Sequence, residues 1–264
     1  MADHHLQDAL LEQRICELYQ ASKGRYGTPR LQADLRAEGQ RVSRKRISRL
    51  MRRSGLRAKG PRRFVRTTDS DHLLAVCPNL LNREFNVQNA NTVWASDLTF
   101  IPTKEGWLYL VSPSTCIHGW WSAMRWTARC RPRYRWPPFR WRCPRGHRHL
   151  DCSITVTVEA GRSAQARPFC PRSQYVSKAF QAELARIGAR GSMSRRGNCW
   201  DNSVLKSFFS SLKRELLGGA PFESRAVARQ AIFEYIEVFY NWRRRHSSLG
   251  YLTPLEFERQ AQVA

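Results

Sequence analysis

Apolar residues recur at helical spacing through the first 59 residues of the chain. This spacing predicts a first helix in LQDALLEQRICELYQ, whose apolar positions are Leu6, Leu10, Leu11, Ile15, Leu18 and Tyr19. After a turn that contains glycine, Thr28 offers an N-cap with proline at the first helical position, and the second predicted helix ends at Gly39. Ser43 is the predicted N-cap of a third helix, which ends at Gly55.

The third predicted helix, SRKRISRLMRRSG, is strongly basic. Its apolar residues Ile47, Leu50 and Met51 would face inward, which leaves the other faces to Arg44, Lys45, Arg46, Arg49, Arg52 and Arg53. Three short helices with a basic last member fit a helix-turn-helix unit, whose last helix enters the major groove of DNA. We therefore expect DNA contacts from Arg44, Lys45, Arg46 and Arg49. The alternative is a helical hairpin with a solvated basic face.

The pattern changes after this helical region. Residues 60–92 have the proline, arginine and polar composition of a linker, with no lasting period. The next segment, NTVWASDLTFIPT, is alternating and β-branched, and WLYLV follows a Lys-Glu-Gly turn at 104–106. These features predict two strands joined by a tight turn.

Residues 112–172 differ in composition from the rest of the chain. They hold 12 arginines and no lysine, with 5 of the 9 tryptophans, 5 of the 8 cysteines and 7 of the 13 prolines. No helical or strand period is visible, and a GC-rich gene read in the wrong frame gives this enrichment, so we interpret the stretch as bracketed by two compensating frameshifts. Cys143, His147, His149 and Cys152 superficially suggest zinc, but their spacing fits no standard paired-ligand pattern.

Regular patterns return at residue 173. The sequence predicts a helix in SQYVSKAFQAELARIG, a short strand in ARGSM, and a helix in SVLKSFFSSLKRELL that Asp201 and Asn202 can cap. A long helix is predicted in SRAVARQAIFEYIEVFYNWRRRH, with a core side formed by Ala231, Ile232, Tyr235, Ile236, Val238 and Phe239. A final short helix begins at Thr253 and Pro254.

The charge of the chain points to an anionic partner. Lysine and arginine number 45 against 21 acidic residues, a formal net charge of +24, and a polyanion such as DNA is the usual partner of so basic a protein. Because 38 of the 45 are arginine, the codon bias of a GC-rich gene accounts for part of this charge. The sequence contains no apolar run of about 18 residues and no signal peptide, so we expect a cytoplasmic protein without a membrane partner.

Several segments together resemble the OrfB-type transposases of bacterial insertion sequences, relatives of retroviral integrases. They are RYGTPRLQADLR, RLMRRSGLRAK, NTVWASDLTFIPTKEGWLYL, SQYVSKAFQAELARIGARGSMSRRGNCWDNSV, SFFSSLKRELL and AIFEYIEVFYNWRRRHSSLGYLTPLEFE. The resemblance implies an α/β fold. A helix-turn-helix-like region (1–59) and a linker (60–92) would precede an RNase H-like integrase core (93–264). The middle of that core, 112–172, would be disrupted and poorly ordered.

The resemblance also implies a centre of three carboxylates that holds two Mg²⁺ ions, which prefer oxygen ligands. Asp97 matches the first carboxylate, but Cys170 and Lys206 stand at the second and third, with the family spacing of 35 residues between them. Asp201 lies five residues before Lys206 and Glu215 nine after it, so at about 100° per residue neither projects from the same side of a helix. Asp97 alone is expected to bind metal weakly or not at all.

We therefore expect a degenerate member of the family: by ancestry a Mg²⁺-dependent polynucleotidyl transferase that integrates DNA, now a pseudoenzyme. Phosphate contacts are expected from basic residues in the matching segments, namely Arg195, Arg196, Lys213, Arg214, Arg243, Arg244 and Arg245. The expected partners are terminal inverted repeats and target DNA, an OrfA-like protein and further copies of the chain. Two alternatives stay open: a DNA-binding remnant that modulates intact transposase, and a working enzyme in whose sequence errors have replaced the natural residues.

Overall fold

A computed structural model describes residues 2–58, 78–84, 93–115, 125–127, 153–156, 178–186, 188–193, 203–217 and 220–263. The chain forms two compact units. One comprises Met1–Arg63 together with Arg245–Thr253, and the other comprises Phe64–Arg244 together with Pro254–Ala264. None of the helices in the described ranges combines the length and the apolar character needed to cross a bilayer.

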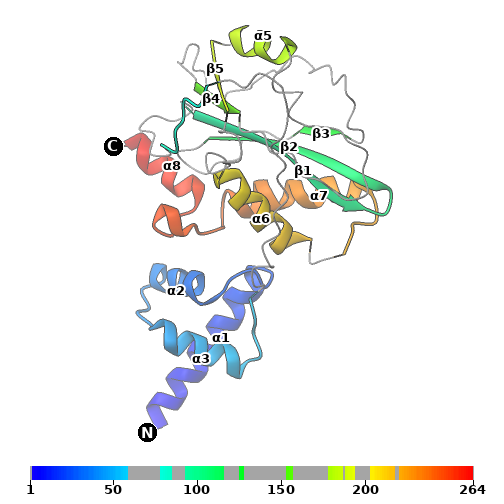
Figure 1. Cartoon of the computed structure of the whole chain (residues 1–264). Helices are drawn as coiled ribbons and strands as arrows, with labels where there is room; N and C mark the ends of the chain where they lie inside the picture. Colours follow the sequence, from blue (N-terminus) through cyan, green and yellow to red (C-terminus); the bar gives the residue numbers. More distant parts are fainter. Residues whose placement is uncertain are drawn as a thin grey trace. The chain divides into compact units, whose positions relative to one another are not determined.

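The N-terminal unit is built on three helices (Figure 1), α1 (Ala2–Ala21), α2 (Thr28–Ala37) and α3 (Arg44–Arg53). Their inward faces form a small apolar core of fully buried side chains, chiefly Ile15, Leu31, Leu35, Ile47 and Leu50. The predicted helix-turn-helix-like arrangement is therefore confirmed. The segment Arg245–Thr253 completes this unit and includes the 3₁₀ turn η3 (Ser247–Leu249).

The ends of α2 and α3 test the predicted caps. The amide of Arg46 donates to Ser43 Oγ at 3.2 Å, so the predicted N-cap of α3 is confirmed. The prediction for α2 was wrong by one residue: Gly27 is the N-cap and Thr28 is already helical. The Thr28 hydroxyl is directed instead to Met51 Sδ, at 3.6 Å, and so caps nothing.

The buried stripe of α1 is narrower than its apolar pattern. Leu11 and Ile15 are buried, but Leu6 and Leu10 are each 62% exposed. Leu10 and Leu11 are about 100° apart around the helix, and only Leu11 lies on the buried side.

The second unit contains a mixed five-stranded sheet in the order β3-β2-β1-β4-β5. Its strands are β1 (Val93–Thr103), β2 (Gly106–Thr115), β3 (Arg125–Thr127), β4 (Ser153–Val156) and β5 (Arg190–Ser192). The predicted hairpin is confirmed as the antiparallel pair β1–β2, and β3 extends it antiparallel to β2. On the other side of β1, β4 and β5 run parallel to it. An α/β core after a helical region is thus confirmed.

Two of these strands, β3 and β4, lie within 112–172, where the sequence pattern predicted none. The Ser-Ile-Thr-Val sequence of β4 is rich in β-branched residues, and tertiary pairing with β1 and β5 makes a strand of a run too short to show a period. Most of 112–172 lies outside the described residues.

Part of the predicted linker is attached to the sheet. The amides of Leu80 and Leu81 donate to the buried Ser192 Oγ at 2.9 and 3.2 Å, and the amide of Met193 donates to the carbonyl of Pro78 at 3.3 Å. Residues 78–84 therefore belong to the second unit, called the core unit from here on, and they lie beside β5.

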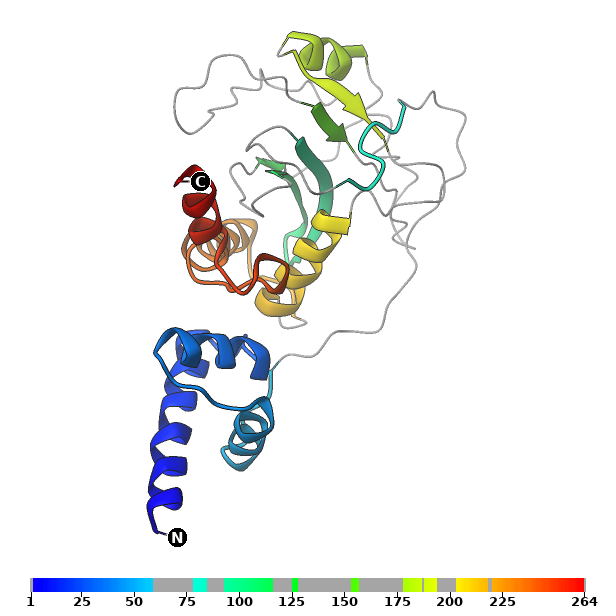
Figure 2. The same ribbon diagram turned by 90° about the vertical axis from the view of Figure 1, so that its left-hand side faces the viewer.

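Helices accompany the sheet: α5 (Lys178–Arg186), α6 (Ser203–Leu216), α7 (Arg225–Glu234) and α8 (Pro254–Val263). In two views α6 and α7 lie on one side of the β1–β2 hairpin, where both contact β1 (Figures 1 and 2). The final helix begins at the predicted Pro254. The described α5 is shorter than the predicted 173–188 helix, whose first five residues lie outside the described ranges.

The long helix predicted after Ser224 changes character at its middle. Ser224 caps α7, but after Glu234 the chain continues as the π-helical segment η2 (Tyr235–Tyr240). A π-helix has a wider turn than an α-helix, so the face that meets the core shifts along the chain. Ile232, Tyr235, Ile236 and Phe239 are buried as predicted, whereas Val238 is 48% exposed and its predicted core role was wrong.

Candidate functional site

Asp97 is placed at the centre of the sheet. It lies on β1, opposite Ser112 of β2, and only 8% of its surface is exposed. A buried carboxylate on a central strand is costly to desolvate unless cations or hydrogen-bond donors compensate its charge. The side chains that surround Asp97 therefore decide what it can do.

Two lysines lie on one flank of α6, the helix that packs on β1. Lys206 and Lys213 are seven residues apart, so at about 100° per residue they lie within about 20° of each other around the helix. Lys206 is half-buried. Desolvation lowers the pKa of Lys213, while the negative charge of Asp97 acts on that amine in the opposite direction. More than a third of Lys213 is exposed.

Among the described residues, Asp97 has no set of oxygen ligands around it that would hold a pair of divalent ions. In the described ranges, no group of three or more His, Cys, Asp or Glu side chains is arranged to hold a metal ion. Lys206 occupies the position expected for the third carboxylate, and an ammonium repels a cation. Cys170 and Asp201 lie outside the described residues.

Glu215, the acid on the far side of α6, is committed to a buried polar cluster. Its carboxylate accepts from Tyr235 Oη at 2.8 Å and from the guanidinium of Arg244, 2.9 Å at the closest. Arg244 also donates to Ser211 Oγ at 2.9 Å and lies over the ring of Tyr240. Burial opposes the charge on Arg244, but Tyr235 and Glu215 raise its pKa overall. This carboxylate is therefore neutralised within the core, away from Asp97.

Some of the basic residues of α3 form ion pairs with acidic residues of α1. Asp8 pairs with Arg46 at 2.7 Å and with Arg49 at 2.6 Å, and Glu12 pairs with Arg53. The hydrogen bond from Arg46 lowers the pKa of Asp8, and that from Arg53 lowers the pKa of Glu12. Two of the four predicted DNA contacts on α3, Arg46 and Arg49, thus already have an acidic partner.

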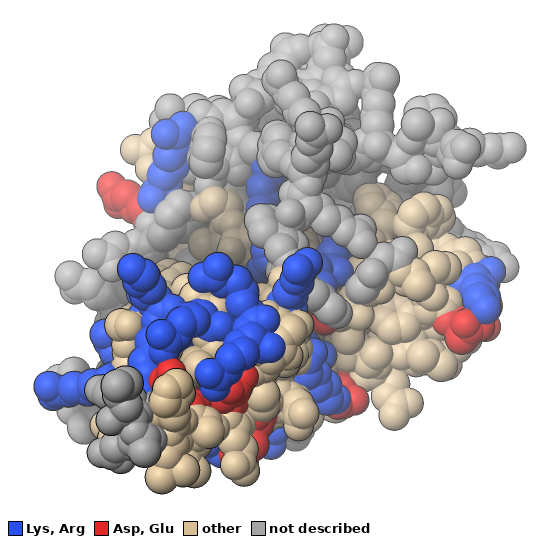
Figure 3. All heavy atoms as spheres, turned by 90° about the horizontal axis from the view of Figure 1, so that it is seen from below, with Lys and Arg blue, Asp and Glu red and all other residues tan. Residues whose placement is uncertain are grey.

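The other two predicted contacts on α3 face solvent. Lys45 is exposed, and Arg44 is exposed while its Nε donates to Gln32 Oε1 at 3.0 Å. Lysine and arginine side chains gather over the face of this unit drawn in Figure 3, with a few acidic side chains among them.

The remaining predicted phosphate contacts are distributed unevenly. Arg243 is exposed just after η2, whereas Arg244 is buried with Glu215. Arg245 is a structural tie of the N-terminal unit: its guanidinium pairs with Asp34 and its amide donates to Tyr26 Oη at 3.0 Å. Arg195 and Arg196 lie outside the described residues.

Pattern analysis missed several residues of the basic N-terminal surface. Asp8 and Glu12 are four residues apart on α1 and therefore share a face, a spacing that could have identified them as partners for the basic helix. Arg36 and Arg41, beside the amino end of α3, carried no signal beyond their charge.

Comparisons with known families match both parts of the chain. Residues 5–64 match the family model described as an HTH-like domain. Residues 206–261, which include α6, α7 and α8, match the model described as an integrase core domain.

Relatives of known name cover almost the whole chain. The chain is 37% identical over 254 residues to the transposase for insertion sequence element IS904 of Lactococcus lactis, which covers 95% of this chain and 94% of the relative. It is 38% identical over 249 residues to transposase InsF for insertion sequence IS3A of Escherichia coli, which covers 92% of this chain and 80% of the relative.

A search of solved structures returned a chain from a simian T-cell lymphotropic virus intasome bound to a PP2A regulatory subunit, B56 gamma. The identity is 11% and the TM-score 0.40, with 92% of this chain and 73% of that chain covered. A similarity this low carries no weight beside the sequence relatives.

Proposed function

This chain belongs to the insertion-sequence transposases, and from that membership we propose that it binds DNA through its N-terminal unit but does not perform strand transfer. The first half of the proposal rests on the basic helix-turn-helix-like unit. The second rests on one observation: an ammonium, Lys206, stands where the family resemblance requires a metal-binding carboxylate.

DNA binding is supported by the chemistry of α3 and its surroundings. In helix-turn-helix proteins the last helix of the motif enters the major groove, and arginine and lysine neutralise backbone phosphates. Arg44 and Lys45 are exposed on α3, and Arg243 and Lys213 add exposed positive charge in the second unit. Such contacts fix the position of a protein on DNA without reading its sequence.

Loss of strand transfer follows from the charge around Asp97. Divalent ions in integrase-type centres activate the attacking oxygen and stabilise the leaving oxygen, which requires two ions about 3.5–4 Å apart. Asp97 alone supplies too few oxygen ligands for such a pair. Lys206 and Lys213 place positive charge on the flank of α6 that faces it, and they stabilise the Asp97 carboxylate in place of metal.

A chain that binds DNA without cutting it would act on an intact transposase. We propose that it occupies terminal inverted repeats, with an OrfA-like protein or further copies of itself as partners. An occupied repeat cannot be used by a working enzyme, so the chain would inhibit transposition in proportion to its abundance.

The test is an in vitro strand-transfer assay on inverted-repeat DNA with Mg²⁺ or Mn²⁺. We expect a salt-dependent DNA shift and no strand-transfer product, from the wild-type chain as well as from Asp97→Ala. Product from the wild type that disappears in Asp97→Ala would overturn the proposal and favour a working enzyme.

A further inference from the structure

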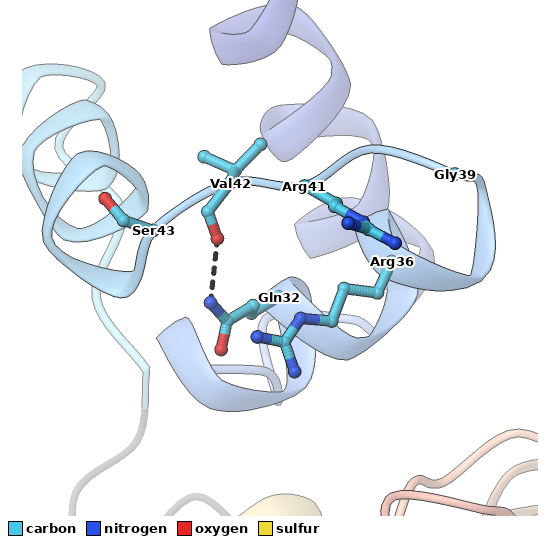
Figure 4. Close-up of a pocket in the computed structure, with 6 residues that line it drawn as sticks. All are labelled: Gln32, Arg36, Gly39, Arg41, Val42 and Ser43. Carbon is cyan, nitrogen blue, oxygen red and sulfur yellow. Dashed lines mark hydrogen bonds between the residues drawn. The ribbon is translucent and has the colours of Figure 1, made fainter.

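A solvent-open hollow of about 760 Å³ lies in the N-terminal unit between α2 and the start of α3 (Figure 4). It is lined by Gln32, Arg36, Gly39, Arg41, Val42 and Ser43. Arg36 comes from the last turn of α2 and Arg41 from the connection to α3, and both line the hollow from different directions (Figure 4).

A buried amide holds this hollow open. Only 6% of Gln32 is exposed, and its Nε2 donates to the carbonyl of Val42 at 2.7 Å. Its Oε1 accepts from Arg44 at 3.0 Å. One side chain on α2 thus fixes both the connection that carries Arg41 and the first residue of α3.

Both arginine side chains line the hollow, and no carboxylate is among the residues that line it. In the described ranges neither Arg36 nor Arg41 forms an ion pair, and the nearby acids of α2 are used elsewhere: Glu38 pairs with Arg14, and Asp34 pairs with Arg245. Two positive charges that line one hollow with no carboxylate beside them favour the binding of an anion there.

The charges on the opposite side of α3 differ in this respect. Arg46 and Arg53 are held by Asp8 and Glu12, so the flank of α3 that faces α1 is neutralised within the protein. Lys45 is exposed on α3 and has no acidic partner among the described residues. Positive charge of this unit is therefore left without an acidic partner at Lys45 and in the hollow.

We infer that this hollow is a binding site for DNA backbone phosphate, in which Arg36 and Arg41 clamp the strand beside the amino end of α3. Arginine suits this role because its planar, fork-shaped donor set matches the oxygens of a phosphate. The inference rests on the proposed DNA binding and adds to it the residues and the side of α3 that contact the strand.

The experiment measures the salt dependence of binding of the full chain to two fluorescently labelled duplexes of unrelated sequence, by anisotropy. The slope of log K against log salt is negative, and each lost phosphate contact reduces its magnitude by about 0.9. Arg36→Ala/Arg41→Ala should therefore reduce the magnitude by about 1.8. Between about 50 and about 200 mM salt, the loss of affinity should then be about tenfold smaller than for wild type. Both duplexes should be affected equally, because phosphate contacts do not depend on sequence.

A matched control removes the same charge elsewhere. Arg229 and Arg259 are exposed in the second unit and form no ion pair within the described ranges, so Arg229→Ala/Arg259→Ala should leave the slope near that of wild type. Arg36→Lys/Arg41→Lys keeps the charge but loses the fork, so it should retain the slope while weakening binding at every salt concentration.

The outcomes separate the two proposals. A wild-type chain that binds neither duplex overturns the proposed function and this site with it. Wild-type binding with an Arg36→Ala/Arg41→Ala slope equal to that of the Arg229→Ala/Arg259→Ala control overturns the phosphate clamp alone.

Discussion

At the residue scale, the core unit depends on a charge pair that is almost fully desolvated. The side chains of Arg244 and Glu215 are 4% and 2% exposed, and Tyr235 and Ser211 satisfy their remaining hydrogen bonds. A buried pair of this kind adds little net stability over an apolar pair, but removal of one partner leaves the other charged and desolvated. The pair joins α6 to the segment that follows η2.

Glu215→Gln should therefore destabilise the core unit. We expect the free energy of unfolding to fall by about 3–5 kcal/mol, because the Arg244 guanidinium keeps its charge without a counter-charge. Urea denaturation of the core unit measures the change. Glu84→Gln, at an exposed carboxylate, is the control and should change stability by less than about 0.5 kcal/mol; an equal effect of both variants would contradict the assigned role of the cluster.

The site around Asp97 gives a second prediction at this scale. Lys206→Glu should not restore strand transfer, because Cys170 still stands at the second carboxylate position and a thiol is a poor ligand for Mg²⁺. The measurement is product formation on inverted-repeat DNA with Mn²⁺. Recovery of activity from this single change would show that the second position is not defective.

At the element scale, ion pairs attach α1 to α3. Asp8 and Glu12 contact three arginines of α3, and these exposed pairs add to the small apolar core around Ile15 and Ile47. The same contacts hold the basic helix at a fixed angle beside α1. The packing of α1 should therefore depend on the charge state of its two acids.

Acidification should loosen α1 from α3. A carboxyl whose pKa is lowered in the folded state stabilises the fold above its ordinary pKa and loses that contribution as the pH falls through the lowered value. For Asp8 and Glu12 the ordinary values are 3.8 and 4.5, so the stabilisation is complete at neutral pH and is lost at more acidic pH.

Amide hydrogen exchange in α1, corrected for the intrinsic rate, measures this loosening. Exchange in the wild-type chain should accelerate below the ordinary carboxyl range, whereas in Asp8→Asn/Glu12→Gln it should be faster at neutral pH and change little with acidification. Equal pH dependence in both proteins would show that the acids do not hold α1 in place.

The elements whose ends are specified by neighbouring residues were predicted from the sequence. Ser43 and Gly55 bound α3, and the hairpin turn before Gly106 joins β1 and β2; each is specified by neighbouring residues and was predicted. The π-helical segment after Glu234 was not predicted, because the apolar pattern continues through it at ordinary helical spacing.

At the scale of the whole molecule, the least predictable contacts join distant parts of the chain. Arg30 Nε donates to the carbonyl of Arg245 across 215 residues of sequence, and no local pattern marks such a pair. The absence of two family carboxylates, at Cys170 and Lys206, stays a prediction from the spacing of motifs in the sequence. Their chemical consequence follows from ligand chemistry alone, since hard divalent ions require several oxygen ligands.

The net charge of +24 also acts at this scale. A charge of this size attracts DNA irrespective of sequence, and in our proposal the Arg36–Arg41 clamp then positions the bound duplex. The proposed function therefore separates the fold of a transposase and its attraction to DNA from its metal chemistry.

The loss of the metal centre is tested most directly by manganese, which scatters anomalously and takes the same oxygen ligands as magnesium. Crystals of the protein soaked in Mn²⁺ should show no pair of ions beside Asp97, because one carboxylate and the neighbouring ammonium groups cannot hold them. Two anomalous peaks about 3.5–4 Å apart at that strand would contradict this loss and would indicate a working metal centre.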